Sequence, residues 1–407
     1  MAPANSYRTF AYLDAARRLG VELLVASEGE HSLVNRMVGG MHVDLQAPHA
    51  VDQLVDEAGR RPFHGVVATD DASVELTSRV ARVLGLPHNP PSAARLSRRK
   101  DLARARLAQA GLPVPRHWQL NLALPLGPQI EQVAYPCVAK PLALSASRGV
   151  IRADNPADLI SACARIQGIL TREAPRDPEE RHTVLVEAFV HGPEVALEGL
   201  LRDGELRVLA LFDKPDPMDG PFFEETYYIT PSRLPVAHQQ AVRRRVAQAC
   251  AAYGLREGPV HAELRISGGD AWIMEVASRT IGGECARLLK FGTGHGLEDL
   301  VLAQAMGRPL DAEAAPGGAG VLMIPIPRAG ILRRVEGVLA ARRVPYIEDL
   351  EISLREGYEL VPLPESSRYL GFVFSKAPTA GDAEQALRSA HSRLNVVVAP
   401  LFNLFAG

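Results

Sequence analysis

Two glutamates in the second half of the chain could hold a divalent cation between them. Glu263 lies in the run 260–266 and Glu275 in the run 271–277, and both runs have the composition of β-strands joined by a polar turn. If the hairpin loop takes three residues, the two carboxylates lie opposite each other on one face. Like charges opposed across strands are destabilising, but Mg²⁺ between them makes the arrangement favourable, because Mg²⁺ prefers one or two carboxylates together with phosphate oxygens. In the alternative register, one acid points to solvent.

A cation follows this acidic pair. Arg279 comes four residues after Glu275, just beyond the end of the second predicted strand. A guanidinium there could bind a substrate carboxylate or the charge that develops on a phosphoryl group during transfer. The alternative interpretation is a surface arginine.

A possible phosphate-binding loop lies earlier in the chain. Residues 135–141 predict a short strand that ends near Lys140, and the small-residue loop 142–149 leads to a second strand. Small side chains let backbone N–H groups approach phosphate oxygens, and the lysine adds a cation. The alternative is an ordinary serine-rich hairpin, because Gly149 is the only glycine of the loop.

Lysine is scarce in this sequence. Lysine and arginine together number 45, yet lysine occurs only at positions 100, 140, 214, 290 and 376. An ammonium is a compact point charge, which the planar guanidinium of arginine replaces poorly. Each remaining lysine is therefore a candidate for a task that needs a point charge, with chance as the alternative.

A third motif could bind a nucleotide base and its sugar. The apolar run 184–190 predicts a strand that leads into a turn, with Glu187 and Glu194 seven residues apart. A nucleotide needs a flat apolar slot, backbone groups for the base and an acceptor for the ribose hydroxyls. A strand–turn–strand with solvated acids is the alternative.

The first part of the chain has the pattern of a small doubly wound α/β domain. Residues 9–19 predict an amphipathic helix closed by Gly20, residues 21–26 and 65–71 predict buried strands, and residues 74–84 predict a helix. The second strand ends in acids, and ligands of open α/β sheets lie at such ends. Such a domain normally opens with a strand, but residues 1–7 make a poor one. Either the domain lacks its first strand or the natural start lies upstream.

The rest of the chain predicts mixed helices and strands. A helix is expected over 97–110, an exposed loop over 171–182 and a linker over 312–320. Beyond the linker, short strands are expected at 321–326, 358–363 and 369–375, followed by a helix over 382–394.

Composition excludes several classes of protein. The 407 residues are 47% hydrophobic and 23% charged, which is ordinary for a globular protein. A net charge of −2 gives no reason to expect nucleic-acid or membrane partners, and no apolar run approaches the roughly 18 residues of a membrane span. The four cysteines form no CxxC pair, so we expect reduced thiols in a cytoplasmic protein.

Taken in order, these motifs resemble the ATP-grasp superfamily over roughly residues 85–300. The resemblance implies that Lys100 and Lys140 bind ATP, with Lys140 also catalytic, and that the loop carrying Ser145 and Ser147 closes over the phosphates. It further implies the following roles: adenine contacts for Glu187, Phe189 and Val190, a ribose contact for Glu194, Mg²⁺ ligation by Glu263 and Glu275, and catalysis by Arg279.

Within the superfamily, the chain is most similar to the L-amino acid ligase and carnosine-synthase-like branch. Residues 280–284 resemble a substrate-binding turn of that branch, which implies substrate contacts for Arg279, Gly282 and Gly283. Residues 212–225 resemble its long loop over the amino-acid pocket, which adds Glu224 as a substrate residue. Many members carry asparagine two residues after the second metal carboxylate, where this chain has Ala277. The number of Mg²⁺ ions, one or two, therefore stays open, as does Mn²⁺ in their place.

The resemblance implies an α/β plus α+β protein with the ATP-grasp fold. Its expected parts are an N-terminal Rossmann-like domain over 1–95, an ATP-grasp domain of two subdomains over 96–315, with a lid at about 116–190, and a small C-terminal α+β domain over 316–407. A homodimer is a further expectation from the family.

The expected activity is ATP-dependent ligation of a small-molecule carboxylate to an amine through an acyl phosphate, with an amino acid as at least one substrate. His261 and Glu224 are the candidates for a general base. Three alternatives stay open: another carboxylate-activating ATP-grasp enzyme of the purine-biosynthesis or biotin-carboxylase kind, a nucleotide-binding module without catalysis, and an unrelated Rossmann-like protein. The absence of a G-x-G-x-x-G motif near the first strand disfavours the last.

Overall fold

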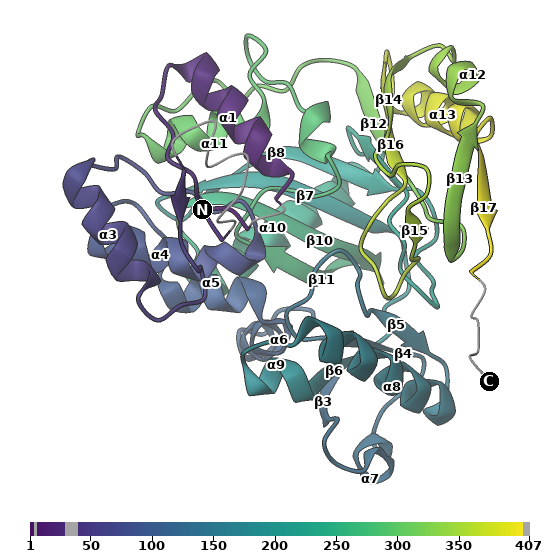
Figure 1. Ribbon diagram of the computed structural model, residues 1–407. Coiled ribbons are helices and arrows are strands. Elements are labelled where there is room, and N and C mark those ends of the chain that lie inside the picture. The colour runs from purple at the N-terminus through teal and green to yellow at the C-terminus, as the bar shows by residue number, and fades with distance from the viewer. Residues whose placement is uncertain (4–5, 29–39, 402–407) are drawn as a thin grey trace.

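The computed structural model describes residues 1–3, 6–28 and 40–401, and its largest element is one antiparallel sheet (Figure 1). In order across the sheet, the eight strands are β11 (Asp270–Ala277), β10 (Gly258–Ser267), β7 (Glu194–Arg202), β8 (Glu205–Lys214), β9 (Tyr227–Thr230), β12 (Gly318–Ile324), β16 (Gly371–Ala377) and β14 (Ile347–Ile352). The last three come from the region that is predicted to form a small C-terminal domain. The strands on either side of position 315 thus share one sheet, and the domain limits themselves stay predictions.

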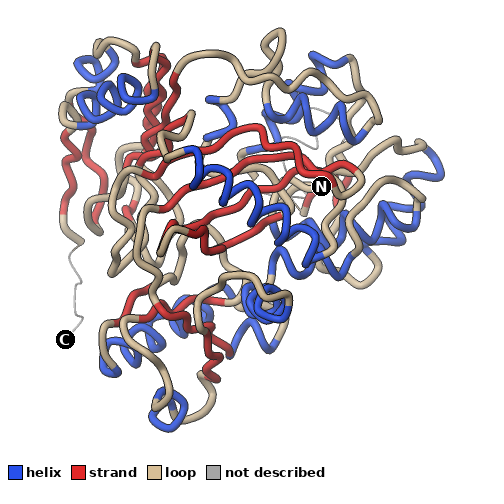
Figure 2. Tube along the Cα trace, turned by 180° about the vertical axis from the view of Figure 1, so that it is seen from behind, coloured by secondary structure: helices blue, strands red, loops and turns tan. Residues whose placement is uncertain are grey.

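The two faces of the large sheet pack against different helices, because side chains alternate along each strand. Val195 of β7 points into a core shared with α10 (Val236–Tyr253), the helix that crosses the strands in Figure 2. Its neighbour Ala196 points to the opposite core, which is shared with α1 (Arg8–Leu19) and α11 (Leu297–Ala305). This second face is therefore covered in part by α1 and α11.

A second sheet of four strands lies within the predicted lid, at the bottom of Figure 1. Its strands, in order across the sheet, are β3 (His117–Asn121), β6 (Thr183–Ala188), β4 (Cys137–Pro141) and β5 (Ile151–Ala153). One face is covered by α8 (Pro156–Glu173), whose first turn is capped by the Asn155 side chain, and the short α7 (Leu126–Ile130) lies beside β3.

The segment 171–182 is mostly exposed, as predicted, but it is not a loop. α8 continues to Glu173, and α9 (Pro178–His182) follows after a short break. Glu180 is buried and pairs with Arg98 at 2.7 Å, so this one charge of the segment binds a neighbouring helix instead of water.

The single helix predicted at 97–110 is two helices, α5 (Pro91–Arg98) and α6 (Lys100–Gln109). Arg99 between them is extended, with φ −95° and ψ 104°. Its guanidinium is fully buried and pairs with Asp101, Asp177 and Glu179, while the next backbone N–H donates to the lid at Leu142 O. The break places Lys100 at the start of a helix that faces the lid.

The N-terminal region has less regular strand structure than the sequence predicts. Its elements are β1 (Ala26–Ser27), β2 (Met41–His42), α3 (Ala50–Arg60), the 3-10 turn η1 (Asp71–Ser73) and α4 (Val74–Val83). Only Ala26 of the predicted strand 21–26 pairs in a ladder, and residues 65–71 form no strand. Both segments instead bond to the first two residues: Ala2 N donates to Ala26 O, and Thr69 N donates to Met1 O. Because, among the described residues, Met1 and Ala2 alone bridge these two segments through the bonds named, no regular strand ladder forms between them.

The C-terminal region adds a separate small sheet, ordered β15 (Glu359–Leu360), β13 (Gly330–Glu336) and β17 (Asn395–Ala399), with α12 (Val338–Arg342) and α13 (Ala380–His391) beside the larger sheet. The predicted linker is shorter than expected, since β12 begins at Gly318. Among the described helices, none is both long and apolar enough to cross a membrane.

Candidate active site

A large cavity separates the lid sheet from the large sheet. Its volume of about 1320 Å³ exceeds the several hundred cubic ångströms of most small-molecule sites, so it has room for a nucleotide and further substrates. The sequence-predicted residues that line it are Lys100, Lys140, Ser145, Ser147, Glu187, Phe189, Val190, Glu194, Glu263, Glu275, Arg279, Gly282 and Gly283. Residues from four distant stretches of the chain thus meet in one space.

Glu224 is the exception among the predicted site residues. Among the described residues, Glu225 lines the cavity and Glu224 does not. Burial raises the pKa of the Glu224 carboxyl, which instead accepts a hydrogen bond from the backbone of Ile326. Glu224 therefore lies outside this cavity, and its substrate role stays a prediction.

The lid wall of the cavity carries a buried carboxylate between two cations. Lys140 at the end of β4 donates to Glu187 at 2.6 Å, and Arg104 of α6 donates to the other oxygen at 2.5 Å. Burial alone would raise the pKa of Glu187, but Arg104 and Lys140 outweigh it and lower the pKa to about 2. Burial lowers the pKa of Lys140. On this wall two cations, Arg104 and Lys140, thus contact one acid.

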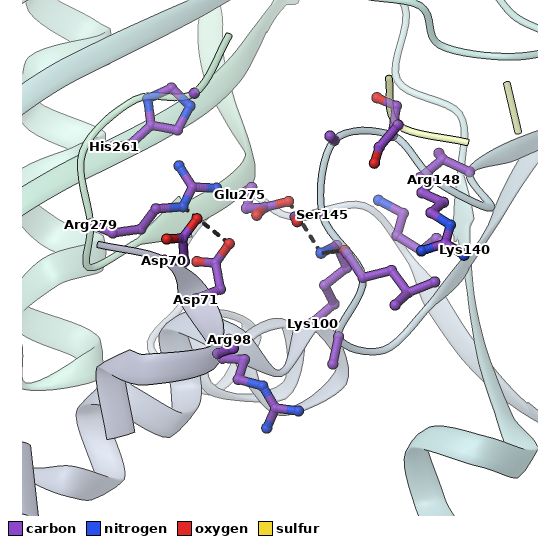
Figure 3. Close-up of a pocket in the computed structure, with 18 of the residues that line it drawn as sticks. Asp70, Asp71, Arg98, Lys100, Lys140, Ser145, Arg148, His261, Glu275 and Arg279 are labelled. Carbon is purple, nitrogen blue, oxygen red and sulfur yellow. Dashed lines mark hydrogen bonds and ion pairs between the residues drawn. The ribbon is translucent and has the colours of Figure 1, made fainter. Parts of the chain in front are cut away.

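The small-residue loop folds over this wall. Ala146 and Ser147 of this loop have left-handed φ values of 53° and 54°. Lys100 Nζ donates to Leu144 O at 2.8 Å, and the loop is tied to the C-terminal region where Gly149 N donates to Pro364 O at 2.9 Å. Figure 3 shows Ser145 near Lys100 and Glu275.

An apolar slot adjoins the loop. Phe189, Val138, Met218 and Phe223 form a small buried cluster at the hinge between the two sheets. Arg265 stacks 4.9 Å from the Phe189 ring centre, and its Nη1 donates to Val190 O at 2.8 Å. This is the flat apolar surface that the sequence predicts beside residues 187–194.

The hairpin of β10 and β11 opposes its two acids, but not by the predicted route. Glu263 and Glu275 are direct cross-strand partners. Ser267 pairs with Asp270, so the loop has two residues instead of three, and a bulge after Glu263 leaves Met274 as the extra residue. The predicted loop length is wrong, and the bulge restores the predicted opposition.

The opposed acids each face a lysine. Glu275 lies 3.4 Å from Lys100 Nζ, and Glu263 lies 3.0 Å from Lys214 Nζ. Lys214 also bonds Glu194 at 2.8 Å and Glu225 at 2.7 Å, and carboxylate oxygens of the three glutamates lie within 4.8 Å of one another. The Lys214 ammonium lies among these three carboxylates. Carboxylate oxygens are ligands that Mg²⁺ prefers, so the opposed Glu263 and Glu275 have the chemistry that would hold it.

Lys214 and Glu225 are residues that the sequence reasoning missed. Despite burial, the three glutamates raise the pKa of Lys214 well above its usual value. Burial raises the pKa of Glu225 to about 7, even though Lys214 acts in the other direction. The scarcity of lysine was the available signal, and the pairing of Glu194 with Lys214 across β7 and β8 supplies the reason.

Arg279 is buried between the hairpin and the N-terminal region. Its Nε donates to Asp71 at 3.0 Å, its Nη1 donates to Thr280 O at 3.0 Å, and Figure 3 shows Asp71 beneath it. Burial works against the charge of Asp71, but Arg279 and Lys100 lower the pKa of that carboxyl. Asp71 is a further residue without a predicted role, although its place at the end of the run 65–71 was the signal.

Two glycines in the turn after Arg279 lie close to side chains of neighbouring elements. Gly283 has φ 62°, and a Cβ atom there would lie 2.2 Å from Met323 Sδ. A Cβ on Gly282 would lie 3.3 Å from Arg8 Nη2. Both glycines therefore let the backbone approach its neighbours while lining the cavity.

Comparison with known families agrees with this geometry. Residues 13–88 match the ATP-grasp N-terminal domain, residues 133–287 match the ATP-grasp domain, and residues 322–399 match the L-amino acid ligase C-terminal domain 2. The chain belongs to the ATP-grasp superfamily and carries the C-terminal domain of L-amino acid ligases.

The chain is also similar to individual ligases and synthases. The fold matches that of an L-amino acid ligase from Bacillus licheniformis with a TM-score of 0.84 and 25% identity over 98% of both chains. Alanine–anticapsin ligase of Bacillus subtilis is 24% identical over 257 residues, which cover 59% of this chain and 54% of that ligase. Carnosine synthase 1 of Gallus gallus is 27% identical over 350 residues, which cover 81% of this chain and 37% of that enzyme.

Proposed function

We propose that this protein joins a carboxylate to an amine with conversion of ATP to ADP and phosphate, that an acyl phosphate is the intermediate, and that at least one substrate is an amino acid. The observation that carries the proposal is the convergence of Arg279, the opposed carboxylates Glu263 and Glu275, and the lid lysine Lys140 on one cavity. The similarity to L-amino acid ligases supports an amino acid as substrate.

In this proposal the nucleotide lies between the two sheets. Adenine enters the slot beside Phe189 and Val190, and Glu194 accepts from the ribose with lone pairs left over from its bonds to Lys214 and Arg265. Lys100, Lys140 and the backbone around Ser145 and Ser147 contact the phosphates. Glu187 already accepts from two cations, so its task is to hold Lys140 in place rather than to contact adenine directly.

Glu263 and Glu275 would hold Mg²⁺, which supplies neutralisation of phosphate charge. Protein side chains would bind the remaining negative charge. Among described residues, Arg279 uses Nε and Nη1 for Asp71 and Thr280, which leaves Nη2 for the substrate carboxylate and the acyl-phosphate oxygens. Ala277, two residues after Glu275, offers no side-chain ligand atom. Glu263 and Glu275 would therefore be the side-chain ligands of the ion.

The second step needs a proton acceptor for the amine. Glu225 lines the cavity, and its pKa of about 7 is close to the value at which a carboxylate is most effective as a general base. Water must be kept from the acyl phosphate, and the loop at 142–149, tied to Pro364, provides the cover.

The test measures phosphate release from ATP and Mg²⁺ with amino acids singly and in pairs, with mass spectrometry of products. Release that needs two amino acids, with a product equal to their sum minus water, is the expected result. Release with a ribonucleotide amine or bicarbonate instead would replace the substrate assignment. Tight ATP binding without turnover over the whole panel would favour a nucleotide-binding module and contradict the proposal.

A further inference from the structure

A buried histidine links the proposed metal site to the segment that carries Arg279. His261 of β10 lies directly opposite Glu198 of β7, with Nδ1 3.4 Å from the Glu198 carboxylate. Its Nε2 forms a long hydrogen bond of 3.4 Å to Glu263, two residues further along the same strand face. The side chains of Glu198 and His261 are 0% and 6% exposed, so this contact takes place out of solvent.

The other end of this chain of contacts holds the backbone after Arg279. Glu198 accepts a hydrogen bond from Ile281 N at 3.1 Å. Ile281 follows Thr280, whose carbonyl accepts from Arg279 Nη1. The sequence of contacts therefore runs from Glu263 through His261 and Glu198 to the turn that fixes Arg279.

The surroundings leave Glu198 and His261 few other partners. Three cross-strand neighbours on this face are alanines: Ala210 beside Glu198, Ala277 beside His261 and Ala196 beside Glu263, whereas Glu263 also lies opposite Glu275 and accepts from Lys214 at 3.0 Å. Within the described part of the chain, Glu198 Oε1 and His261 Nδ1 have no hydrogen-bond partner. Buried polar groups cost free energy unless they are paired, which favours the 3.4 Å contact of the imidazole with Glu198 and its 3.4 Å hydrogen bond with Glu263.

We infer that His261 is a positioning residue, which orients the Glu263 carboxylate for the cation and links it through Glu198 to the Arg279 turn. This inference rests on the proposed function, because it assigns a partner to a proposed metal ligand. Outer partners of metal ligands commonly change metal affinity or activity by 10–100-fold when removed. The expected consequence is that cation binding at Glu263 and the position of Arg279 depend on each other.

Two substitutions separate the two contacts of the imidazole. The amide nitrogen of Gln reaches roughly the place of Nε2, and that of Asn roughly the place of Nδ1. His261→Asn therefore removes the contact with Glu263, whereas His261→Gln retains it. Mn²⁺ binding, measured by calorimetry with saturating non-hydrolysable ATP analogue, should weaken about 10-fold in His261→Asn and recover towards the wild-type value in His261→Gln.

The matched control is His391→Asn. His391 is half-buried, contacts the Tyr227 hydroxyl at 2.8 Å and does not line the cavity. This variant should bind Mn²⁺ as the wild type does, and equal losses in His261→Asn and His391→Asn would overturn the inference. Wild-type Mn²⁺ affinity in His261→Asn would overturn it too.

A further variant separates this inference from the proposed function. Glu263→Gln should lose most Mn²⁺ binding; if it binds Mn²⁺ normally, the proposed metal site is wrong and the inference falls with it. If Glu263→Gln loses the ion but His261→Asn does not, only the inference fails.

A further test needs no substitution, so that a folding defect in a variant cannot affect it. It uses the wild-type protein labelled with ¹⁵N-histidine. The His261 ring resonances should shift when Mg²⁺ is added with the ATP analogue. Ring resonances that stay unchanged at saturating Mg²⁺ would contradict a contact with the metal carboxylate.

Discussion

The two walls of the cavity balance charge in opposite ways. On the lid wall, Glu187 lies between Lys140 and Arg104, so cations outnumber the acid. On the large sheet, Lys214 lies among Glu194, Glu225 and Glu263, so acids outnumber the cation that they surround. The cationic wall suits phosphate oxygens and the acidic wall suits a divalent cation. A nucleotide with its metal would meet complementary charge on each side.

The acidic wall should be the more sensitive one. Glu275→Gln removes one charge of the opposed pair and should reduce ADP formation to background, because a neutral amide is a poor partner for Mg²⁺. Steady-state ADP release is the measurement, with circular dichroism to show an intact fold. Full activity in this variant would remove the argument for a metal on this wall.

Arg279→Ala should lower turnover about 1000-fold, the effect expected of an arginine that stabilises transferring phosphoryl charge. ATP affinity should change far less, since the lid wall supplies most phosphate contacts. Turnover and calorimetric ATP binding are measured together. Arg334→Ala is the control, because Arg334 is exposed and pairs only with Glu336 among described residues. Equal turnover in the two variants would show that Arg279 is not catalytic.

The contribution of the lid wall to the free energy of unfolding should depend on pH. Glu187 has a pKa lowered to about 2, against an ordinary value of 4.5, so its contribution is present above pH 4.5 and is lost as the pH falls through 2. The unfolding free-energy difference between wild type and Glu187→Gln should therefore shrink by about 3 kcal/mol over that range. Urea unfolding at several pH values measures it, and a difference independent of pH would contradict the buried ion pairs.

Lys140→Met should have the smallest effect of the four, a weakening of ATP binding of about 10-fold, or ~1.4 kcal/mol. Arg104 still neutralises Glu187 in this variant, so the wall loses its excess cation but not its fold. Calorimetric titration with ATP is the measurement, and Lys376→Met, which alters an exposed lysine outside the cavity, is the control. Unaltered ATP affinity in Lys140→Met would show that the excess positive charge of the lid wall does not contribute to nucleotide binding.

Local sequence patterns predicted the elements whose partners are near in the chain. The hairpin with Glu263 and Glu275, the strand that ends at Lys140 and the helix closed by Gly20 are all present. Each depends on alternation, helical periodicity or turn residues within a short stretch, which are signals that a sequence displays directly.

Long-range contacts account for what the sequence did not reveal. Arg279 and Asp71 are 208 positions apart, and nothing in either segment indicates that they meet. Glu225 was missed in favour of Glu224 because no regular element fixes which side chain of that loop faces inward. The sequence around Arg99 has a continuous helical pattern. The helix breaks there because the Arg99 guanidinium pairs with Asp177 and Glu179 at the start of α9.

The sheet shared across position 315 limits how the protein can be recombined. β12 continues the sheet from β9, with Ala319 opposite Thr230 and Leu322 opposite Tyr227. Residues 316–407 exchanged for the same region of another ligase would have to reproduce this register and the side chains along the seam. A chimera joined at that position without such matching would expose β9 as an unpaired edge and invite aggregation. Crossover points in a gene-shuffling experiment are better placed elsewhere.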